Sequence, residues 1–194
     1  MPQIQDQKLL YHLTALTNLE NILESGMLSR NRLSMDMVTD VADPDILSSR
    51  ERNALADYVP FHFFARNPFD GCVQDQHRDK DFILITVKRE LARNCGWKVT
   101  PMHPLAQPEP AILDYDEGIA AIDWEAMNRR DYHDDHSKSV CMAECLSPET
   151  VGWEVFFAIY VPNENVGNQV RELKEARGAD FHVNERPTMF LTMQ

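Results

Sequence analysis

The sequence predicts an α+β fold whose strands pair largely antiparallel. Segments with strand-like alternation are scattered along the chain, and most of them are not separated by regular helices. A doubly wound nucleotide-binding fold would instead alternate strands and helices regularly. The motifs GxGxxG, GxxxxGK[ST] and GxSxG do not occur, so the dinucleotide-dehydrogenase, P-loop and hydrolase classes lack their usual signals.

Length and composition are those of one globular domain. The chain has 194 residues, of which 43% are hydrophobic and 26% charged, enough for one domain with a substantial core and short for two. It has no repeat or long linker, so we expect a single domain over residues 1–194. No apolar run approaches the roughly 20 residues that span a bilayer, and the first residues lack the features of a secretory signal. We therefore expect a cytoplasmic protein that does not bind a membrane.

The charge is acidic overall but unevenly distributed. A net charge of -12 argues against non-specific adhesion to nucleic acid or anionic lipid. Residues 30–98 nevertheless hold 11 basic and 11 acidic side chains, whereas residues 109–135 hold 9 acids and 2 bases. A negatively charged partner is therefore expected to approach the first of these regions.

The first elements are the clearest. Residues 8–14 (KLLYHLT) alternate between an apolar face and a face that carries His12 and Thr14, which predicts a strand. Residues 17–26 have a polar start, helical apolar spacing and a glycine stop at Gly26, which predicts a helix.

The remaining elements are predicted from alternation, aromatic content and Pro or Gly breaks. The expected helices are residues 43–57, 121–130 and 163–177. The expected strands are residues 58–64, 81–88, 140–147 and 153–161, with one or two more in the tail. A short helix is expected to follow residue 88. The expected irregular segments are residues 65–71, 100–110 and 130–139.

The predicted strand VCMAECLS (140–147) contains one carboxylate, Glu144. By alternation, Val140, Met142 and Leu146 share its face. A carboxylate among apolar side chains is costly to bury unless it is paired or used. Glu144 is therefore a candidate functional residue.

Other polar residues have a structural and a functional interpretation. A lone histidine on a strand, such as His12, is more often structural, although Thr14 on the same face suits a polar ligand. Arg50 and Arg52 are surface residues by default, with a phosphate or carboxylate clamp as the alternative. The aromatic residues around position 61 are core by default, with ring stacking as the alternative.

A zinc site is the weakest of the open alternatives. It would use His133, His136, Cys141 and Cys145, spaced H-x2-H-x4-C-x3-C. This spacing is looser than in recognised zinc sites, so we predict no metal.

Several stretches, taken in order, resemble one known family. They are YHLTALTNLENILESGMLSR (11–30), DILSSRER (45–52), YVPFHFFARNPF (58–69), IDWEAM (122–127) and VCMAECL (140–146). Their order and character resemble the DarT-type ADP-ribosyltransferase toxins, with gaps, over roughly residues 10–190. The resemblance implies an ADP-ribosyltransferase-like split mixed β-sheet core with peripheral helices and a cleft for NAD as co-substrate.

The resemblance also implies roles for individual residues. His12 matches the histidine that contacts the NAD ribose, Thr14 belongs to the same binding strand, and Asn18 matches an asparagine at the head of the next helix. Arg50 matches the arginine that holds NAD for reaction, with Arg52 as the fallback. Glu144 matches the catalytic glutamate.

For the acceptor, we expect Arg66 to contact a phosphate backbone and Tyr58 or Phe61 to stack on a base. Further basic candidates for this track are Arg78, Lys80, Lys88 and Arg89.

The function implied is NAD-dependent mono-ADP-ribosylation of a base in single-stranded DNA, by the toxin of a pair whose cognate antitoxin protein removes the mark or blocks the cleft. Asp131, Asp134 and Asp135 would repel a phosphate backbone that they faced, which favours an alternative RNA or protein acceptor for the same chemistry. A catalytically silent NAD-binding module is the third interpretation.

Overall fold

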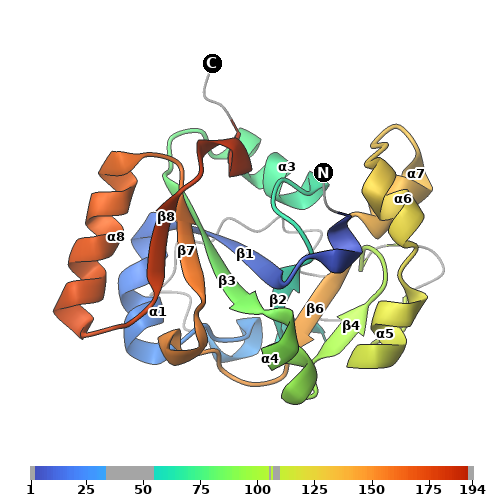
Figure 1. The fold of residues 1–194 in the computed structure, drawn as a ribbon, viewed down its shortest axis with the longest axis horizontal. Coiled ribbons are helices and arrows are strands. Elements are labelled where there is room, and N and C mark those ends of the chain that lie inside the picture. The colour runs from blue at the N-terminus through green and yellow to red at the C-terminus, as the bar shows by residue number, and fades with distance from the viewer. Residues whose placement is uncertain (1–2, 34–54, 105, 107–109, 192–194) are drawn as a thin grey trace.

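The computed structural model describes residues 3–33, 55–104, 106 and 110–191. Within them, eight strands form one sheet in the order β5-β4-β6-β2-β1-β3-β7-β8, flanked by helices (Figure 1). The strands are β1 (Leu9–Ala15), β2 (Val59–His62), β3 (Phe82–Lys88), β4 (Lys98–Thr100), β5 (Leu113–Asp114), β6 (Glu144–Ser147), β7 (Ala158–Val161) and β8 (His182–Glu185). The α-helices are α1 (Leu19–Ser25), α3 (Pro68–Gln76), α4 (Arg89–Asn94), α5 (Tyr115–Ala121), α6 (Trp124–Arg129), α7 (Asp135–Val140) and α8 (Glu164–Arg177).

The sheet is divided into two halves that meet at β1 and β2. These two strands share one register pair, Tyr11 with His62, whereas β1 pairs with β3 along its whole length. All described pairings are antiparallel except that of β7 with β8, which is parallel. The split, mixed sheet with helices around it confirms the predicted α+β class.

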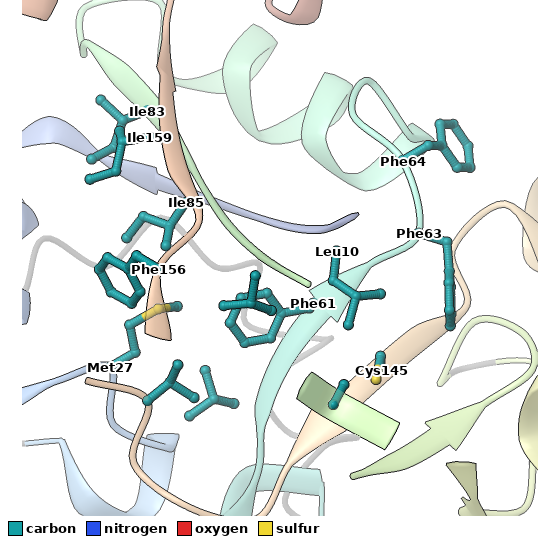
Figure 2. Packing of buried hydrophobic residues seen from close by; sticks show 14 of the residues in the cluster. Leu10, Met27, Phe61, Phe63, Phe64, Ile83, Ile85, Cys145, Phe156 and Ile159 are labelled. Atoms are coloured by element: carbon teal, nitrogen blue, oxygen red, sulfur yellow. The ribbon is translucent and has the colours of Figure 1, made fainter. Parts of the chain in front are cut away.

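Hydrophobic packing covers both faces of the sheet. The larger cluster includes Phe61 and Cys145 together with Leu19 of α1 and Val166 of α8, and Figure 2 shows part of it around Leu10, Phe61 and Cys145. The smaller cluster packs Tyr11 and neighbouring strand residues against α3. Helices α1 and α8 contact each other beside the β7–β8 end of the sheet, while α5, α6 and α7 lie at the β4–β6 end (Figure 1).

The structure confirms several predicted elements. The strand near residues 8–14, the helix ending at Gly26 and the helix at residues 163–177 are present as β1, α1 and α8. Gly26 has φ 77°, a conformation that favours glycine. Of the helix expected at residues 43–57, residues 43–54 lie outside the described residues, and Leu55–Asp57 form a 3-10 turn.

Other predicted elements were wrong because side-chain caps start helices where the sequence looked irregular. Asn67 accepts a hydrogen bond from the Asp70 N–H and, with Pro68 in the first turn, begins α3 inside the segment expected to be a turn. Asp134 accepts from the Ser137 N–H and begins α7 inside the expected polar loop. Helix α5 was not predicted, and the strand expected at residues 153–161 begins only at Ala158.

Among the described residues, no helix combines the length and the apolar character needed to cross a bilayer.

Candidate active site

Glu144 is the first residue of β6, which corrects the predicted strand at residues 140–147. Val140 ends α7, and a turn lies between that helix and the strand. Val140 and Met142 therefore do not share a strand face with Glu144, and of the predicted apolar neighbours only Leu146 does. The sequence reasoning missed this because the Asp134 cap ends the loop early and the helix takes up the residues that follow.

The neighbours of Glu144 across the sheet are polar. Glu144 lies directly opposite His62 of β2 and opposite Thr100 of β4, and His62 lies opposite Tyr11 of β1. Directly paired residues project from the same face. Thr100, Glu144, His62 and Tyr11 thus form a continuous row across four strands, with Glu144 6% exposed and Thr100 fully buried.

The polar groups of this row lie beside the buried carboxylate of Glu144. The His62 ring nitrogen Nδ1 lies 3.3 Å from the carbonyl oxygen of Ala143, so His62 also holds the turn that delivers Glu144. The hydroxyl of Thr100 is buried and has no hydrogen-bond partner among the described residues. Polar groups rather than an apolar wall therefore surround Glu144 within its sheet.

The residues predicted to bind NAD come together near the junction of the half-sheets. The Nδ1–H of His12 donates to the carbonyl of Pro60 at 2.7 Å, because only a protonated nitrogen can bond to a carbonyl oxygen. The neutral ring therefore has Nε2 as its acceptor nitrogen. The Asn18 amide donates to the Thr14 hydroxyl at 3.2 Å, and both residues are buried.

The two sets of candidates leave the sheet on different faces. Tyr11 continues the row of Glu144, so His12 and Thr14, which alternate with it, project from the opposite face of β1. His12 is next to Tyr11 of the single β1–β2 register pair, and it contacts Pro60 of β2, two residues before His62. The sequence could predict that His12 and Thr14 share a face, but not that β1 meets the Glu144 half of the sheet at one position.

The predicted clamp residues Arg50 and Arg52 lie outside the described residues. Among the predicted acceptor contacts, Tyr58 is half-buried and precedes β2, and Arg66 is exposed on the segment after β2. The Nη1 of Arg66 donates to the carbonyl of Thr188 at 3.3 Å.

The predicted role of Phe61 in stacking on a base is corrected, because its side chain is fully buried. Its ring lies 5.2 Å from that of Trp97 and 5.6 Å from that of His12, measured between centroids. A ring enclosed in this way cannot stack on a base, so the predicted substrate contact of Phe61 is wrong. It instead supports the position of His12.

Arg89 is also a core residue rather than a member of a surface track. Its guanidinium donates to the carbonyls of Gln5, Leu9 and Phe63 at 3.2, 3.1 and 2.8 Å. It also lies over the rings of Phe63 and Trp124, and burial lowers the pKa of Arg89. Arg89 thus fixes the segment that follows His62, a role that its sequence position does not reveal.

The acidic loop before Glu144 uses two of its carboxylates internally. Asp131 accepts from the N–H of His133 at 3.1 Å. Asp134 caps α7 and lies 3.6 Å from Arg129. The Arg129 contact offsets part of the charge of Asp134, whereas the backbone hydrogen bond does not remove the charge of Asp131.

The residues considered for zinc contact different partners. His136 lies 2.9 Å from a carboxylate oxygen of Asp123, and the Cys141 thiol contacts the Met127 carbonyl. Burial raises the pKa of Cys141 to about 11, which disfavours the thiolate that zinc requires. In the described part of the chain, no group of three His, Cys, Asp or Glu side chains is placed to hold a metal ion.

Comparisons with known proteins identify relatives of this chain. The chain is 25% identical over 188 residues to a DNA ADP-ribosyl transferase of Thermus sp. (strain 2.9), covering 87% of this chain and 90% of that protein. It is 28% identical over 193 residues to a DNA ADP-ribosyl transferase–DNA ADP-ribosyl glycohydrolase fusion protein of Thermosipho africanus (strain H17ap60334). That match covers 93% of this chain but 49% of the fusion protein, so the chain spans about half of its length.

Solved structures place the fold in the same group. Thermus sp. 2.9 DarT in complex with ADP-ribosylated ssDNA matches with a TM-score of 0.82 at 20% identity, over 95% of this chain and 96% of that one. The same protein in complex with NAD+ matches with a TM-score of 0.77, also at 20% identity, over 96% of this chain and 98% of that one. The family model described as "ssDNA thymidine ADP-ribosyltransferase, DarT" matches residues 11–191. The chain therefore belongs to the DarT family of ssDNA thymidine ADP-ribosyltransferases.

Proposed function

We propose that this chain transfers ADP-ribose from NAD to a thymidine base in single-stranded DNA. The observation that carries the proposal is the position of the buried Glu144, which lies opposite His62 in a row of polar residues. The family model matches the chain over residues 11–191, which include both residues. The relatives solved with NAD+ and with ADP-ribosylated ssDNA support the choice of donor and acceptor.

We assign the NAD-binding role to the β1 region. Because β1 and β2 share a single register pair, NAD bound where the two half-sheets part would reach His12 from one half and Glu144 from the other. The proton on Nδ1 of His12 fixes the orientation of its ring against Pro60, so that the ring can meet a ribose hydroxyl through Nε2. Thr14 and Asn18 supply a hydroxyl and an amide, held together by their own hydrogen bond, and both groups suit the polar parts of NAD. Arg50 remains the proposed pyrophosphate clamp on the strength of the family resemblance.

Glu144 is the proposed catalytic group. The nicotinamide–ribose bond breaks through a state in which the ribose carries positive charge, as in glycoside hydrolysis. A carboxylate can hold the ribose hydroxyls in place and take the proton from the base nitrogen as that nitrogen bonds to the ribose carbon. Nicotinamide leaves with the electron pair of the broken bond, so the atoms and charges balance without a further reactant.

We further propose that the protein is a single ADP-ribosyltransferase domain acting in the cytoplasm as the toxin of a toxin–antitoxin pair. The relative that fuses a DNA ADP-ribosyl transferase to a DNA ADP-ribosyl glycohydrolase supports this, because a glycohydrolase of that kind would reverse the modification. A separate antitoxin protein would have the same role here.

The test uses adenylate-labelled NAD with single-stranded DNA that contains or lacks thymidine, duplex DNA, RNA and a protein extract. Glu144→Gln is compared with Glu149→Gln, the same substitution on an exposed residue just beyond β6. We expect label only on thymidine-containing single strands, a loss of about 100-fold or more in Glu144→Gln, and wild-type transfer in Glu149→Gln. Label on RNA or protein would show that the acceptor is not single-stranded DNA. NAD left intact in every reaction would overturn the enzymatic assignment.

A further inference from the structure

Two exposed arginines and a tyrosine form a cluster beside the segments that lead to Glu144 and His62. Arg66 follows β2, while Arg130 and Tyr132 lie between α6 and α7. The Tyr132 hydroxyl donates to the backbone carbonyl of Arg66 at 3.4 Å, which joins the two segments. We refer to Arg66, Arg130 and Tyr132 as the arginine–tyrosine cluster.

Both arginines have an unusual backbone conformation. Arg66 has φ 61° and Arg130 has φ 52°, and within the described ranges no other non-glycine residue has positive φ. Arg130 occupies the left-handed position that ends α6, where glycine or asparagine is the usual residue. Such conformations cost free energy and cluster at functional sites, so two arginines in this state, joined through one tyrosine, suggest that their side chains are needed there.

The guanidinium groups of the cluster are not neutralised by described residues. Neither Arg66 nor Arg130 forms an ion pair within the described part of the chain. Among the other exposed arginines, Arg78, Arg93, Arg129 and Arg177 pair with carboxylates. Arg32 and Arg186, like the two arginines of the cluster, form no ion pair with a described residue. In a protein of net charge -12, two exposed arginines without carboxylate partners make a local positive site.

The side chains of the cluster are partly ordered by their surroundings. The Arg130 guanidinium lies 4.8 Å from the ring centroid of Phe64, on the segment that Figure 2 shows leaving β2. Tyr132 is 38% exposed. Burial raises the pKa of Tyr132, and the positive charges of Arg130 and Arg66 partly oppose that rise.

The cluster lies within reach of the catalytic candidate. Arg66 is four residues beyond His62, which bounds their Cα separation at about 14 Å. Arg130 also acts electrostatically on Cys141, which is three residues before Glu144. A nucleotide strand that contacts the cluster can therefore present a neighbouring base to Glu144.

The acids that follow the cluster in sequence have partners outside it. Asp131 and Asp134 are engaged in hydrogen bonds within their own loop. The buried Asp70 also influences the pKa of Tyr132. Because burial raises the pKa of Asp70 to about 8, this carboxyl is mostly uncharged at neutral pH.

We propose that the arginine–tyrosine cluster binds the acceptor strand, with Arg66 and Arg130 contacting its phosphates and Tyr132 stacking on a base next to the modified thymidine. Arginine forks match phosphate geometry, and aromatic side chains supply base stacking in single-strand binding sites. This inference rests on the proposed function for its choice of single-stranded DNA. It replaces Phe61, which is buried, with Tyr132 as the stacking residue.

The test measures binding without NAD, so that no modification takes place. A fluorescein-labelled, thymidine-containing single strand of about 12 nucleotides is titrated with the full chain at NaCl concentrations from about 50 to 200 mM. The variants are Arg66→Gln, Arg130→Gly, Tyr132→Ala and Tyr132→Phe. Arg93→Gln is the matched control, because it removes one exposed positive charge on α4 that is paired with Asp116 and does not belong to the cluster.

We expect each arginine variant to weaken binding and to reduce the slope of log affinity against log salt by about 0.7. Tyr132→Ala should lose roughly tenfold or more in affinity, while Tyr132→Phe, which keeps the ring, should lose much less. Arg130→Gly should keep a wild-type thermal midpoint, because relief of the left-handed strain offsets the lost contact with Phe64. This result would separate lost binding from lost folding.

Two results would overturn the inference. In the first, the variants bind the strand with the affinity and salt slope of Arg93→Gln, which leaves the proposed transferase function standing. In the second, the wild-type chain does not bind the single strand in this assay. The label-transfer experiment with Glu144→Gln decides the proposed function separately, since it reads covalent transfer rather than binding.

Discussion

Replacing Asp70 with asparagine removes a carboxyl group that the fold buries without a donor. Asp70 lies in the first turn of α3 and is 1% exposed. Neither of its carboxyl oxygens has a hydrogen-bond partner in the described part of the chain. Burial raises the pKa of Asp70 from 3.8 to about 8, opposed only in part by the side chain of Asn67.

The effect on stability follows from the direction of this shift. The folded pKa lies above the unfolded value, so the folded chain holds a proton that the unfolded chain has lost. The contribution of Asp70 is complete below about pH 4 and falls by about 1.4 kcal/mol per pH unit as the pH rises to about 8. This amounts to a loss of about 3 kcal/mol by pH 6 and about 6 kcal/mol by pH 8. Asparagine cannot ionise, so Asp70→Asn lacks this loss.

Urea unfolding at pH 5, 6 and 7, followed by tryptophan fluorescence, measures the difference. The free energy of unfolding of Asp70→Asn minus that of wild type should increase by about 3 kcal/mol between pH 5 and pH 7. The matched control is Asp75→Asn, which changes an exposed carboxylate of α3 that pairs with Arg78. Its free energy of unfolding minus that of wild type should be nearly the same at all three pH values. A constant difference for Asp70→Asn as well would refute the reasoning.

Three further substitutions test the packing around the site. Arg89→Lys should lower the free energy of unfolding by about 2–4 kcal/mol, because lysine cannot serve three backbone carbonyls at once; an unchanged urea midpoint would contradict this role. Thr100→Val removes a buried hydroxyl without a described partner and should raise stability by about 1 kcal/mol, whereas a lower thermal midpoint would show that the hydroxyl is satisfied. Phe61→Ala should cost about 3–5 kcal/mol, and a near-wild-type free energy of unfolding would be incompatible with its burial between Trp97 and His12.

The sequence predicted best those features that depend on neighbouring residues. The alternation around His12, the helix that ends at Gly26 and the polar helix α8 follow from local spacing and local stop signals, and each is present. The order of short motifs also predicted the split mixed sheet. That prediction needed the family resemblance, because no local pattern shows that β1 and β2 share a single register pair.

The features that were missed depend on residues far apart in the chain. Phe61 packs against Trp97, which follows it by 36 residues. Arg89 donates hydrogen bonds to backbone carbonyls of three different segments. Local cues also failed where one side chain decided the outcome. The caps at Asn67 and Asp134 turned expected loops into helices, and the second of these moved the start of the Glu144 strand.

The pairing of β2 with β6 has a consequence for when the site forms. His62 and Glu144 are 82 residues apart in sequence, so their contact closes a long loop, and contacts of high sequence separation form slowly. During synthesis the amino-terminal part of a chain emerges and begins to fold first. A nascent chain that has not yet reached β6 holds the His12 region without Glu144, the proposed catalytic residue. For a toxin, an unfinished chain would therefore lack transferase activity, and an antitoxin would have only completed molecules to counter.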